Sequence, residues 1–335
     1  MAMLEVKNLS TEFYTENGAV RAVRDVTLHV EKGEVLGIVG ESGSGKSQTM
    51  FTVMGLLAGN GKVTTGSIKL NGEEISPLNF ASEKEYTQKM DSIRGNDMAM
   101  IFQDPMTFLN PVLKIKTQLI EPIMNHNPNI SKSEAVERGI ELMRKVGIPS
   151  PETRIDQYPF QFSGGMRQRI IIAIALACNP KVIIADEPTT ALDVTIQAQV
   201  LELIASLKDE IDSSIIMITH DLGVVASICD RIAIMYGGKI VEEGTTDEIF
   251  YNPQHPYTKG LLSCVSNPEE KERKELKPIP GSPPDLLNIE NNCPFKDRCE
   301  NAMKVCAMGL PEAVELTSTH KYTCWLSHPY AKKGA

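Results

Sequence analysis

The sequence predicts an α/β fold built around a largely parallel sheet, and three patterns support this prediction. Short β-rich runs alternate with helical stretches in the second half of the chain, which is the rhythm of βαβ units. The β-rich runs there are 182–185, 214–219, 231–236 and 239–242, and the helical stretches are 194–212 and 222–228. Further β-rich runs open the chain at 4–9, 20–30, 34–39 and 67–70. Between about 105 and 180 the β signal disappears, and helical periodicity predicts an inserted helical subdomain.

The bulk composition limits the class of protein. With 335 residues, the chain is long enough for two domains, or for one large domain with an appendage. Its 34 Lys and Arg against 43 Asp and Glu give a net charge of −9, which disfavours a nucleic-acid partner. The longest apolar stretch, 170–178, is too short to cross a bilayer, and the first residues lack the pattern of an export signal. We therefore expect a cytoplasmic location.

A glycine-rich segment, Gly40 to Ser47, follows the apolar run 35–39 and precedes a helix-like stretch. This is the phosphate-binding P-loop pattern in its required context. Its glycines allow backbone N–H groups and the next helix N-terminus to face phosphate oxygens. Lys46 is expected to reach the β- and γ-phosphates, and the Ser47 hydroxyl to bind Mg²⁺. The predicted nucleotide-binding residues here are Ser42, Gly43, Ser44, Gly45, Lys46, Ser47 and Gln48.

Two acids, Asp186 and Glu187, end the apolar run that begins at Val182. A buried strand would bring both carboxylates to its C-terminal edge, beside the phosphates. Asp186 is then expected to hold Mg²⁺ through water, and Glu187 to polarise the attacking water. The alternative is that the two acids cap the next helix. His220 follows another predicted strand and could reach the γ-phosphate, although a lone histidine there is more often structural.

A second phosphate-ready helix start lies at Ser163, Gly164 and Gly165. If the helical insert carries this turn away from the P-loop, the two sites cannot serve one phosphate within one chain. A dimer in which each chain completes its partner's site is therefore expected.

These motifs together resemble those of the ATP-binding cassette (ABC) ATPases. They are GESGSGKS at 40–47, IFQDP at 101–105, FSGGMRQR at 162–169, IIADEP at 183–188, TALD at 190–193 and His220. The resemblance implies ATP and Mg²⁺ as ligands and a RecA-like core with an antiparallel β subdomain. It also implies that Gln103 touches Mg²⁺ and senses a membrane partner, that Asp193 links the two sites and that His220 senses the γ-phosphate.

Two further positions bear on how the base and ribose of the nucleotide are bound. Phe13, next to Tyr14, occupies the place where the family stacks an aromatic ring on adenine, and the alternative is a simple packing residue. Met166 departs from the family's usual glutamine, so a side-chain hydrogen bond to the ribose is in doubt at that position. Gln168 is expected to substitute in part.

Two further segments narrow the family resemblance to one group of ABC ATPases. They are IFQDPMTFLNP at 101–111 and NPQHPYT at 252–258. These segments resemble the ATPase subunits of oligopeptide and dipeptide importers. The resemblance implies a second, non-identical ATPase in a head-to-tail dimer, two membrane permeases and an extracytoplasmic binding protein, with this chain peripheral on the cytoplasmic face. Nickel or another small solute is an alternative cargo. A soluble, non-transport ABC ATPase is the third possibility, which a single cassette with a short helical insert disfavours.

The composition changes after about residue 258, and we place a domain boundary there. Residues 1–258 form the predicted ATP-binding domain, and 259–335 form a C-terminal extension that begins with a linker at 267–284. Four cysteines crowd the extension: Cys293, Cys299, Cys306 and Cys324. Four thiolates can hold a [4Fe–4S] cluster or zinc, and free thiols are the other reading. The importer resemblance implies the cluster, as either a structural clip or a sensor. Cys178, Cys229 and Cys264 are expected to be packing residues.

Overall fold

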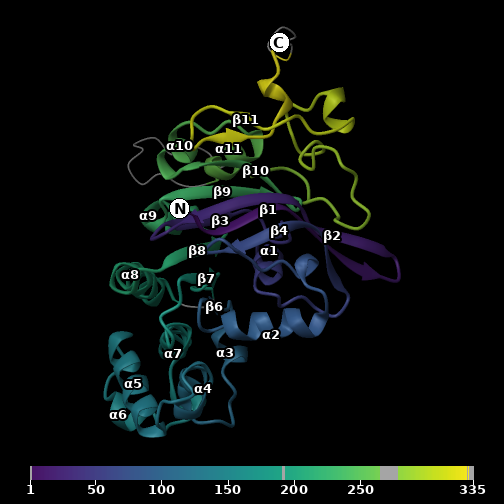
Figure 1. Ribbon diagram of the computed structural model, residues 1–335. Helices are drawn as coiled ribbons and strands as arrows, with labels where there is room; N and C mark the ends of the chain where they lie inside the picture. Colours follow the sequence, from purple (N-terminus) through teal and green to yellow (C-terminus); the bar gives the residue numbers. More distant parts are fainter. Residues whose placement is uncertain (1, 191–192, 265–277, 330, 332–335) are drawn as a thin grey trace, which may run out of the picture.

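The computed structural model describes residues 2–190, 193–264, 278–329 and 331. The chain forms two sheets, with helices on either side of the larger one (Figure 1). The smaller sheet is antiparallel, in the order β2 (Gly18–Glu31), β1 (Ala2–Thr15), β4 (Gly61–Leu70) and β5 (Glu73–Glu74). It supplies the antiparallel β subdomain that the family resemblance implied.

The larger sheet has eight strands. Their order is β11 (Val314–Glu315), β12 (Lys321–Tyr322), β10 (Lys239–Thr245), β9 (Arg231–Tyr236), β3 (Val35–Val39), β8 (Ser214–Thr219), β7 (Val182–Asp186) and β6 (Met98–Ile101). The five strands from β9 to β6 run parallel, as the alternating pattern predicted. Parallel strands present their carboxyl ends at one edge of the sheet, so the loops after β3, β6, β7 and β8 meet there.

Both faces of this sheet are buried, which explains why its strands read as continuous apolar runs. On β3, Val35 and Val39 belong to one hydrophobic cluster, while Leu36 and Ile38 belong to the other. The first cluster joins the sheet to the helical insert, and the second joins it to the antiparallel sheet. The central strand is therefore fixed from both sides, and the loop that follows it is held rigidly.

Eleven α-helices lie in the described part of the chain. They are α1 (Lys46–Val53), α2 (Glu83–Ile93), α3 (Pro105–Phe108), α4 (Ile115–His126), α5 (Lys132–Lys145), α6 (Pro151–Arg154), α7 (Gly164–Ala175), α8 (Val194–Ile211), α9 (Leu222–Ile228), α10 (Thr246–Tyr251) and α11 (Pro256–Ser263). In Figure 1, α3 to α7 gather at one end of the molecule, where the sequence predicted a helical subdomain. None of the described helices is both long and apolar enough to span a membrane.

The C-terminal extension lies at the opposite end, and it contributes to the main sheet (Figure 1). Its short strand β12 pairs with β10, and β11 pairs with β12. The predicted boundary at 258 thus separates two stretches of sequence that share one sheet. Of the predicted linker at 267–284, residues 267–277 lie outside the described residues.

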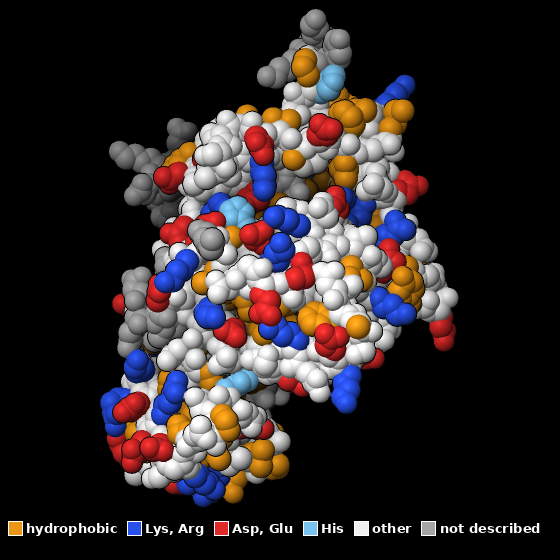
Figure 2. Space-filling view, in the orientation of Figure 1, with side chains coloured by type: hydrophobic (Ala, Val, Ile, Leu, Met, Phe, Trp, Pro, Cys, Tyr) orange, Lys and Arg blue, Asp and Glu red, His pale blue; other side chains and the backbone are white. Residues whose placement is uncertain are grey.

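Basic and acidic side chains alternate over the face drawn in Figure 2. No broad basic surface gathers on that face, which agrees with the acidic composition.

Candidate functional site

The P-loop begins directly after β3, and two of its glycines are required by close contacts. A Cβ atom on Gly40 would lie 2.1 Å from the Met235 carbonyl oxygen. Gly45 has a φ of +100°, and a Cβ atom there would lie 2.3 Å from the Ala22 carbonyl oxygen. Both distances are far below a van der Waals contact, so only glycine fits. The helix α1 starts at Lys46, immediately after Gly45.

Lys46 is buried, with 5% of its surface exposed. Its Nζ atom donates hydrogen bonds to the carbonyl oxygens of Gly40 (2.7 Å) and Glu41 (2.9 Å). Burial lowers the pKa of Lys46, and the carboxylates of Glu187, Asp186 and Glu41 oppose that shift. The Lys46 ammonium group therefore lies within the P-loop, close to Asp186 at the end of β7 and to Glu187, which follows it.

Ser47 and Asp186 meet across the edge of the sheet. The Ser47 hydroxyl donates a hydrogen bond of 2.9 Å to Asp186 Oδ1. Burial and the neighbouring Glu187 carboxylate raise the pKa of Asp186, and the Ser47 hydrogen bond partly opposes them. A hydroxyl beside a carboxylate supplies the oxygen ligands that Mg²⁺ prefers.

Three polar side chains contact the carboxylate of Glu187. Its Oε2 atom accepts hydrogen bonds of 2.9 Å from both Gln103 Nε2 and Thr190 Oγ1. Its Oε1 atom lies 3.3 Å from His220 Nδ1. The structure therefore brings together the predicted residues Gln103, Glu187 and His220, which come from three different loops.

Thr190 is a member of this group that sequence reasoning missed. It opens the TALD segment, which was recognised as a motif, but no role was assigned to its hydroxyl. Its position three residues after Glu187 is the signal, because the turn between them brings the two side chains together. A hydrogen bond from the Thr190 backbone N–H to the Glu187 carbonyl oxygen (3.1 Å) closes that turn.

The residues predicted to serve a partner chain lie at the starts of α7 and α8, which Figure 1 shows on the side of the helical insert. Ser163 and Gly164 are exposed, and the Ser163 hydroxyl caps α7 by accepting a hydrogen bond from the Met166 N–H (3.3 Å). Asp193 is also exposed and caps α8 through the Ile196 N–H (3.0 Å). Residues 191–192 of the same motif lie outside the described residues.

Two other predicted residues have packing roles. A Cβ atom on Gly165 would lie 2.6 Å from the Ile196 side chain, so glycine is needed where α7 approaches α8. Gln168 is fully buried, at 0% exposure, and neither polar atom of its side chain has a hydrogen-bond partner. The substitution of Gln168 for the missing glutamine at 166 stays a prediction, and in the single chain its amide is enclosed in the subdomain.

Phe13 lies on β1, opposite Gly61 on β4. A Cβ atom on Gly61 would be 2.7 Å from the Phe13 ring, so the ring packs closely against that glycine. The Phe13 residue is half-buried, and its neighbour Tyr14 is exposed. This arrangement leaves the adenine-stacking role a prediction.

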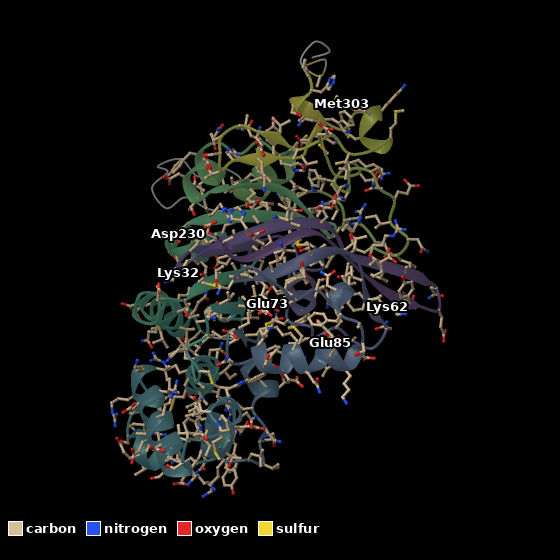
Figure 3. All side chains as sticks on the ribbon, viewed as in Figure 1. Lys32, Lys62, Glu73, Glu85, Asp230 and Met303 are labelled. Carbon is tan, nitrogen blue, oxygen red and sulfur yellow. The ribbon has the colours of Figure 1, made fainter. Side chains whose placement is uncertain are left out.

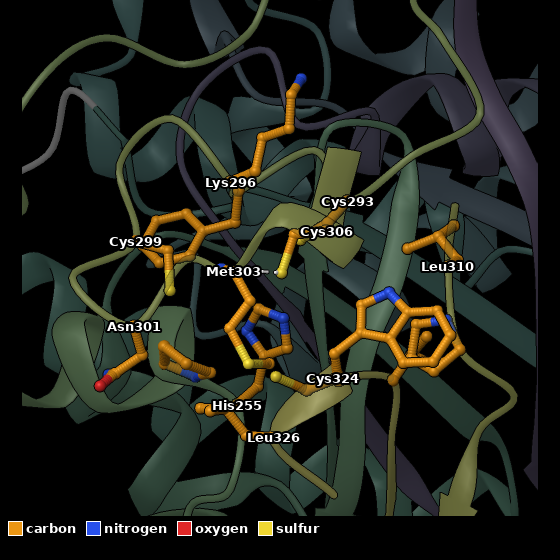
Figure 4. A pocket seen from close by; sticks show the side chains of 15 residues that line it. His255, Cys293, Lys296, Cys299, Asn301, Met303, Cys306, Leu310, Cys324 and Leu326 are labelled. Carbon is orange, nitrogen blue, oxygen red and sulfur yellow. Dashed lines mark hydrogen bonds between the residues drawn. The ribbon is translucent and has the colours of Figure 1, made fainter. Parts of the chain in front are cut away.

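The four clustered cysteines line one pocket, together with His255 and Trp325 (Figure 4). Burial, and to a smaller extent the other three thiols, raise the pKa of Cys293 to about 11. Burial likewise raises the pKa of Cys299 and of Cys324. Within the described residues, no group of three or more His, Cys, Asp or Glu side chains is close enough to hold one metal ion. The described residues therefore contain no preformed site for a single metal ion, and the metal centre stays a prediction.

Comparison with known proteins decides the family. Residues 23–190 match the family described as ABC transporter, and residues 241–306 match the one described as oligopeptide/dipeptide transporter, C-terminal region. The chain belongs to the ABC transporter family. This ABC chain is therefore an ATPase that uses ATP and Mg²⁺, forms a dimer and acts with membrane permease subunits.

Similar proteins agree with the assignment to the ABC family. The oligopeptide transport ATP-binding protein OppD of Bacillus subtilis is 52% identical, over 99% of this chain and 90% of its own length. The dipeptide transport ATP-binding protein DppD of Lactococcus lactis is 50% identical, over 99% of this chain and 93% of its own. A solved dimeric ATP-binding cassette in a post-hydrolysis state with ADP and phosphate is 27% identical. It superposes with a TM-score of 0.62 over 73% of this chain and 99% of its own.

Proposed function

We propose that this ABC ATPase powers the import of dipeptides or oligopeptides. The observation that carries the ATPase part is the convergence of Gln103, Thr190 and His220 on Glu187, beside the Ser47–Asp186 pair. The peptide cargo rests on the likeness to OppD and DppD and on the C-terminal match. Import of nickel or another small solute is the alternative cargo for the same machinery.

Each group of residues in the site is proposed to have a separate role in ATP hydrolysis. The backbone of Ser42, Gly43, Ser44 and Gly45, with the start of α1 through Gln48, holds the phosphates, and Lys46 neutralises the β- and γ-phosphates. Ser47 and Asp186 hold Mg²⁺, which draws charge away from the transferring phosphoryl group. Gln103 is proposed to complete that coordination.

Glu187 is proposed as the general base. It accepts a proton from the attacking water as the water oxygen bonds to the γ-phosphorus and the bond to ADP breaks. Thr190 and Gln103 hold one carboxylate oxygen by hydrogen bonds, so the carboxylate keeps a single orientation. His220, whose side chain is 64% exposed, is free to contact the γ-phosphate from the open side.

A second copy or a related ATPase subunit is proposed to complete the site. Ser163, Gly164 and Asp193 are exposed at the starts of α7 and α8, and a helix N-terminus attracts phosphate. Gly165 is proposed to keep α7 close to α8 in this arrangement. Phe13 is proposed to stack on adenine.

The segment after Gln103 is proposed to contact the permease, at the cytoplasmic face of the membrane. Val112 is 77% exposed, and Phe108 and Leu113 are each 39% exposed. Exposed apolar side chains in one short segment are typical of a docking surface. An extracytoplasmic binding protein is proposed to deliver the cargo.

Changing Glu187 to glutamine tests the catalytic assignment. In the complex reconstituted with its permeases, we expect ATP hydrolysis to fall by at least about a hundredfold, because a general base contributes roughly that factor. The affinity for ATP should stay within about threefold, so ATP becomes trapped. The matched control is Glu83→Gln, which makes the same change on the exposed surface of α2. Unchanged hydrolysis in Glu187→Gln would rule out Glu187 as the base.

The cargo is tested by stimulation of the same complex. With the binding protein present, a di- or oligopeptide should raise the ATPase rate, and nickel should not. Stimulation by nickel alone would favour the alternative cargo.

We further propose that the C-terminal extension, residues 259–335, holds a [4Fe–4S] cluster on Cys293, Cys299, Cys306 and Cys324. The four thiols line one pocket, so one bound group can reach all four of them. Each thiolate would raise the pKa of its neighbours, so the four can ionise together only beside positive charge. The donor set fits such a cluster, which would clip the small extension together.

Metal analysis of anaerobically purified protein tests this assignment. We expect about four iron and four sulfide per chain, with broad visible absorption. Cys306→Ser should lose both, and the matched control Cys178→Ser, outside the quartet, should retain both. Stoichiometric zinc without iron or sulfide would contradict the cluster.

A further inference from the structure

A carboxylate stands inside the phosphate-binding loop of this protein. Glu41 is the second residue of the P-loop, and its backbone carbonyl oxygen accepts a hydrogen bond from Lys46 Nζ. Its backbone N–H donates to the hydroxyl of Tyr257 (2.9 Å). A negative charge at this place repels the triphosphate that the loop is proposed to bind, unless another group neutralises it.

The neutralising group comes from the C-terminal extension. Arg298 approaches Glu41 with both terminal nitrogens: Nη1 lies 2.5 Å from Oε2, and Nη2 lies 3.0 Å from Oε1. This two-pronged geometry is the strongest form of carboxylate recognition by arginine. The two residues are 257 positions apart in the chain.

Arg298 is itself held firmly in place. It is 9% exposed, and its remaining hydrogen bonds go to the Tyr236 hydroxyl (3.1 Å) and to the carbonyl oxygens of Pro280 (2.8 Å) and Ile279 (3.3 Å). Next to it, the buried Phe295 ring packs against both Tyr236 and Tyr257, with ring centroids 5.2 and 5.4 Å away, and the two tyrosine rings contact each other at 4.4 Å. Tyr236 therefore contacts Arg298, and Tyr257 contacts the Glu41 backbone, while Phe295 packs against both tyrosines.

We infer that Arg298 is a positioning residue for ATP binding: it supplies, from the extension, the counter-charge that lets Glu41 remain in the P-loop beside the phosphates. This inference rests on the proposed ATP site and extends it to a segment outside the cassette. Arg298 directly precedes Cys299, so the order of the cysteine-bearing loop controls whether Glu41 is neutralised. The extension thus sets the affinity of the cassette for nucleotide.

The test is the equilibrium affinity of the purified full-length subunit for ATP with Mg²⁺. Arg298→Gln leaves Glu41 unneutralised, and we expect the affinity to fall about tenfold, within the range usual for coupled sites. Adding Glu41→Gln to that variant removes the repelling charge, and affinity should return to within about threefold of wild type. A residue that only fastened the extension would not be rescued in this way.

The matched control is Arg144→Gln, which breaks an exposed ion pair with Glu152 on the helical subdomain and should leave affinity unchanged. Unchanged affinity in Arg298→Gln, or no recovery in the double variant, would overturn the inference. If Arg298→Gln does not fold, Glu41→Gln alone tests the same charge. It leaves Arg298 facing the phosphates, so affinity should be equal or higher, and a tenfold loss would overturn the inference.

The two proposals fail in different ways. If wild-type protein binds no ATP, the proposed function is wrong. If wild-type protein binds ATP and Arg298→Gln binds it equally well, only the role of Arg298 is wrong.

Discussion

Lys46 carries its charge in a place that opposes ionisation. It is buried, and burial lowers its pKa, yet two carbonyl oxygens and three nearby carboxylates support the ammonium form. A buried ammonium surrounded by acceptors suits the proposed role of Lys46, because little reorganisation would be needed when phosphates bind.

Lys46→Ala should weaken ATP binding by at least about tenfold, because the β- and γ-phosphates lose their direct counter-charge. Equilibrium titration of the purified subunit measures this loss. The matched control is Lys32→Ala, directly after β2 (Figure 3). The exposed Lys32 pairs there with Asp212. Equal affinity in Lys46→Ala and wild type would refute the phosphate-binding role of the loop.

At the scale of elements, two helices begin with the same capping device but have different proposed duties. Ser131 caps α5 by accepting a hydrogen bond from the Glu134 N–H (3.2 Å), and Ser163 caps α7 from the Met166 N–H (3.3 Å). The Ser131 cap of α5 has a proposed role only in the stability of the helical subdomain. The α7 cap is also proposed to face the nucleotide of a partner chain.

Ser163→Ala and Ser131→Ala should each cost about 1 kcal/mol of folding stability, because each helix loses one capping hydrogen bond. Urea unfolding of the two variants measures that cost. Only Ser163→Ala should also reduce ATP hydrolysis in the assembled dimer, by about tenfold or more. Full activity in Ser163→Ala would show that the helix start does not contact nucleotide.

On the scale of the whole molecule, the extension is fastened to the cassette at several points. One is Arg298 on Glu41, and another is Glu248 on α10, whose carboxylate accepts hydrogen bonds from Thr317 (2.7 Å) and Thr319 (2.9 Å). Burial would raise the pKa of Glu248, but hydrogen bonds from Thr317, Thr245 and Thr319 outweigh it and lower the pKa to about 2. This anchor therefore depends on an ionised carboxylate.

The depressed pKa sets the direction of the pH dependence. Glu248 stabilises the fold above its ordinary pKa of 4.5, and that contribution is lost as the pH falls from 4.5 towards 2. Glu248→Gln should therefore lower the urea midpoint at pH 7, and its difference from wild type should shrink on acidification. Hydrogen exchange of residues 314–322 would show the same loss locally. A difference that stays constant down to pH 3 would contradict the assignment, and Glu83→Gln serves as the exposed control.

The sequence predicted some of the helices and strands and missed others. The parallel strands and the helical insert were predicted, because strong apolar runs and helical periodicity mark them. The strand β6 and the helix α2 were not predicted: β6 is a run of only four residues with two methionines, and α2 is mostly polar. Their formation depends on neighbours, since β6 pairs with β7.

The main residues of the proposed nucleotide site can be predicted from sequence alone. Gly45, Lys46, Asp186 and Glu187 each lie next to a strand or helix, so short-range backbone geometry fixes where their side chains can go. Contacts between distant segments, in contrast, depend on the packing of the whole chain. That packing buried Gln168, brought Thr190 to Glu187 and seated Arg298 on Glu41, because these outcomes depend on how helices, loops and the extension pack against the sheet rather than on local spacing.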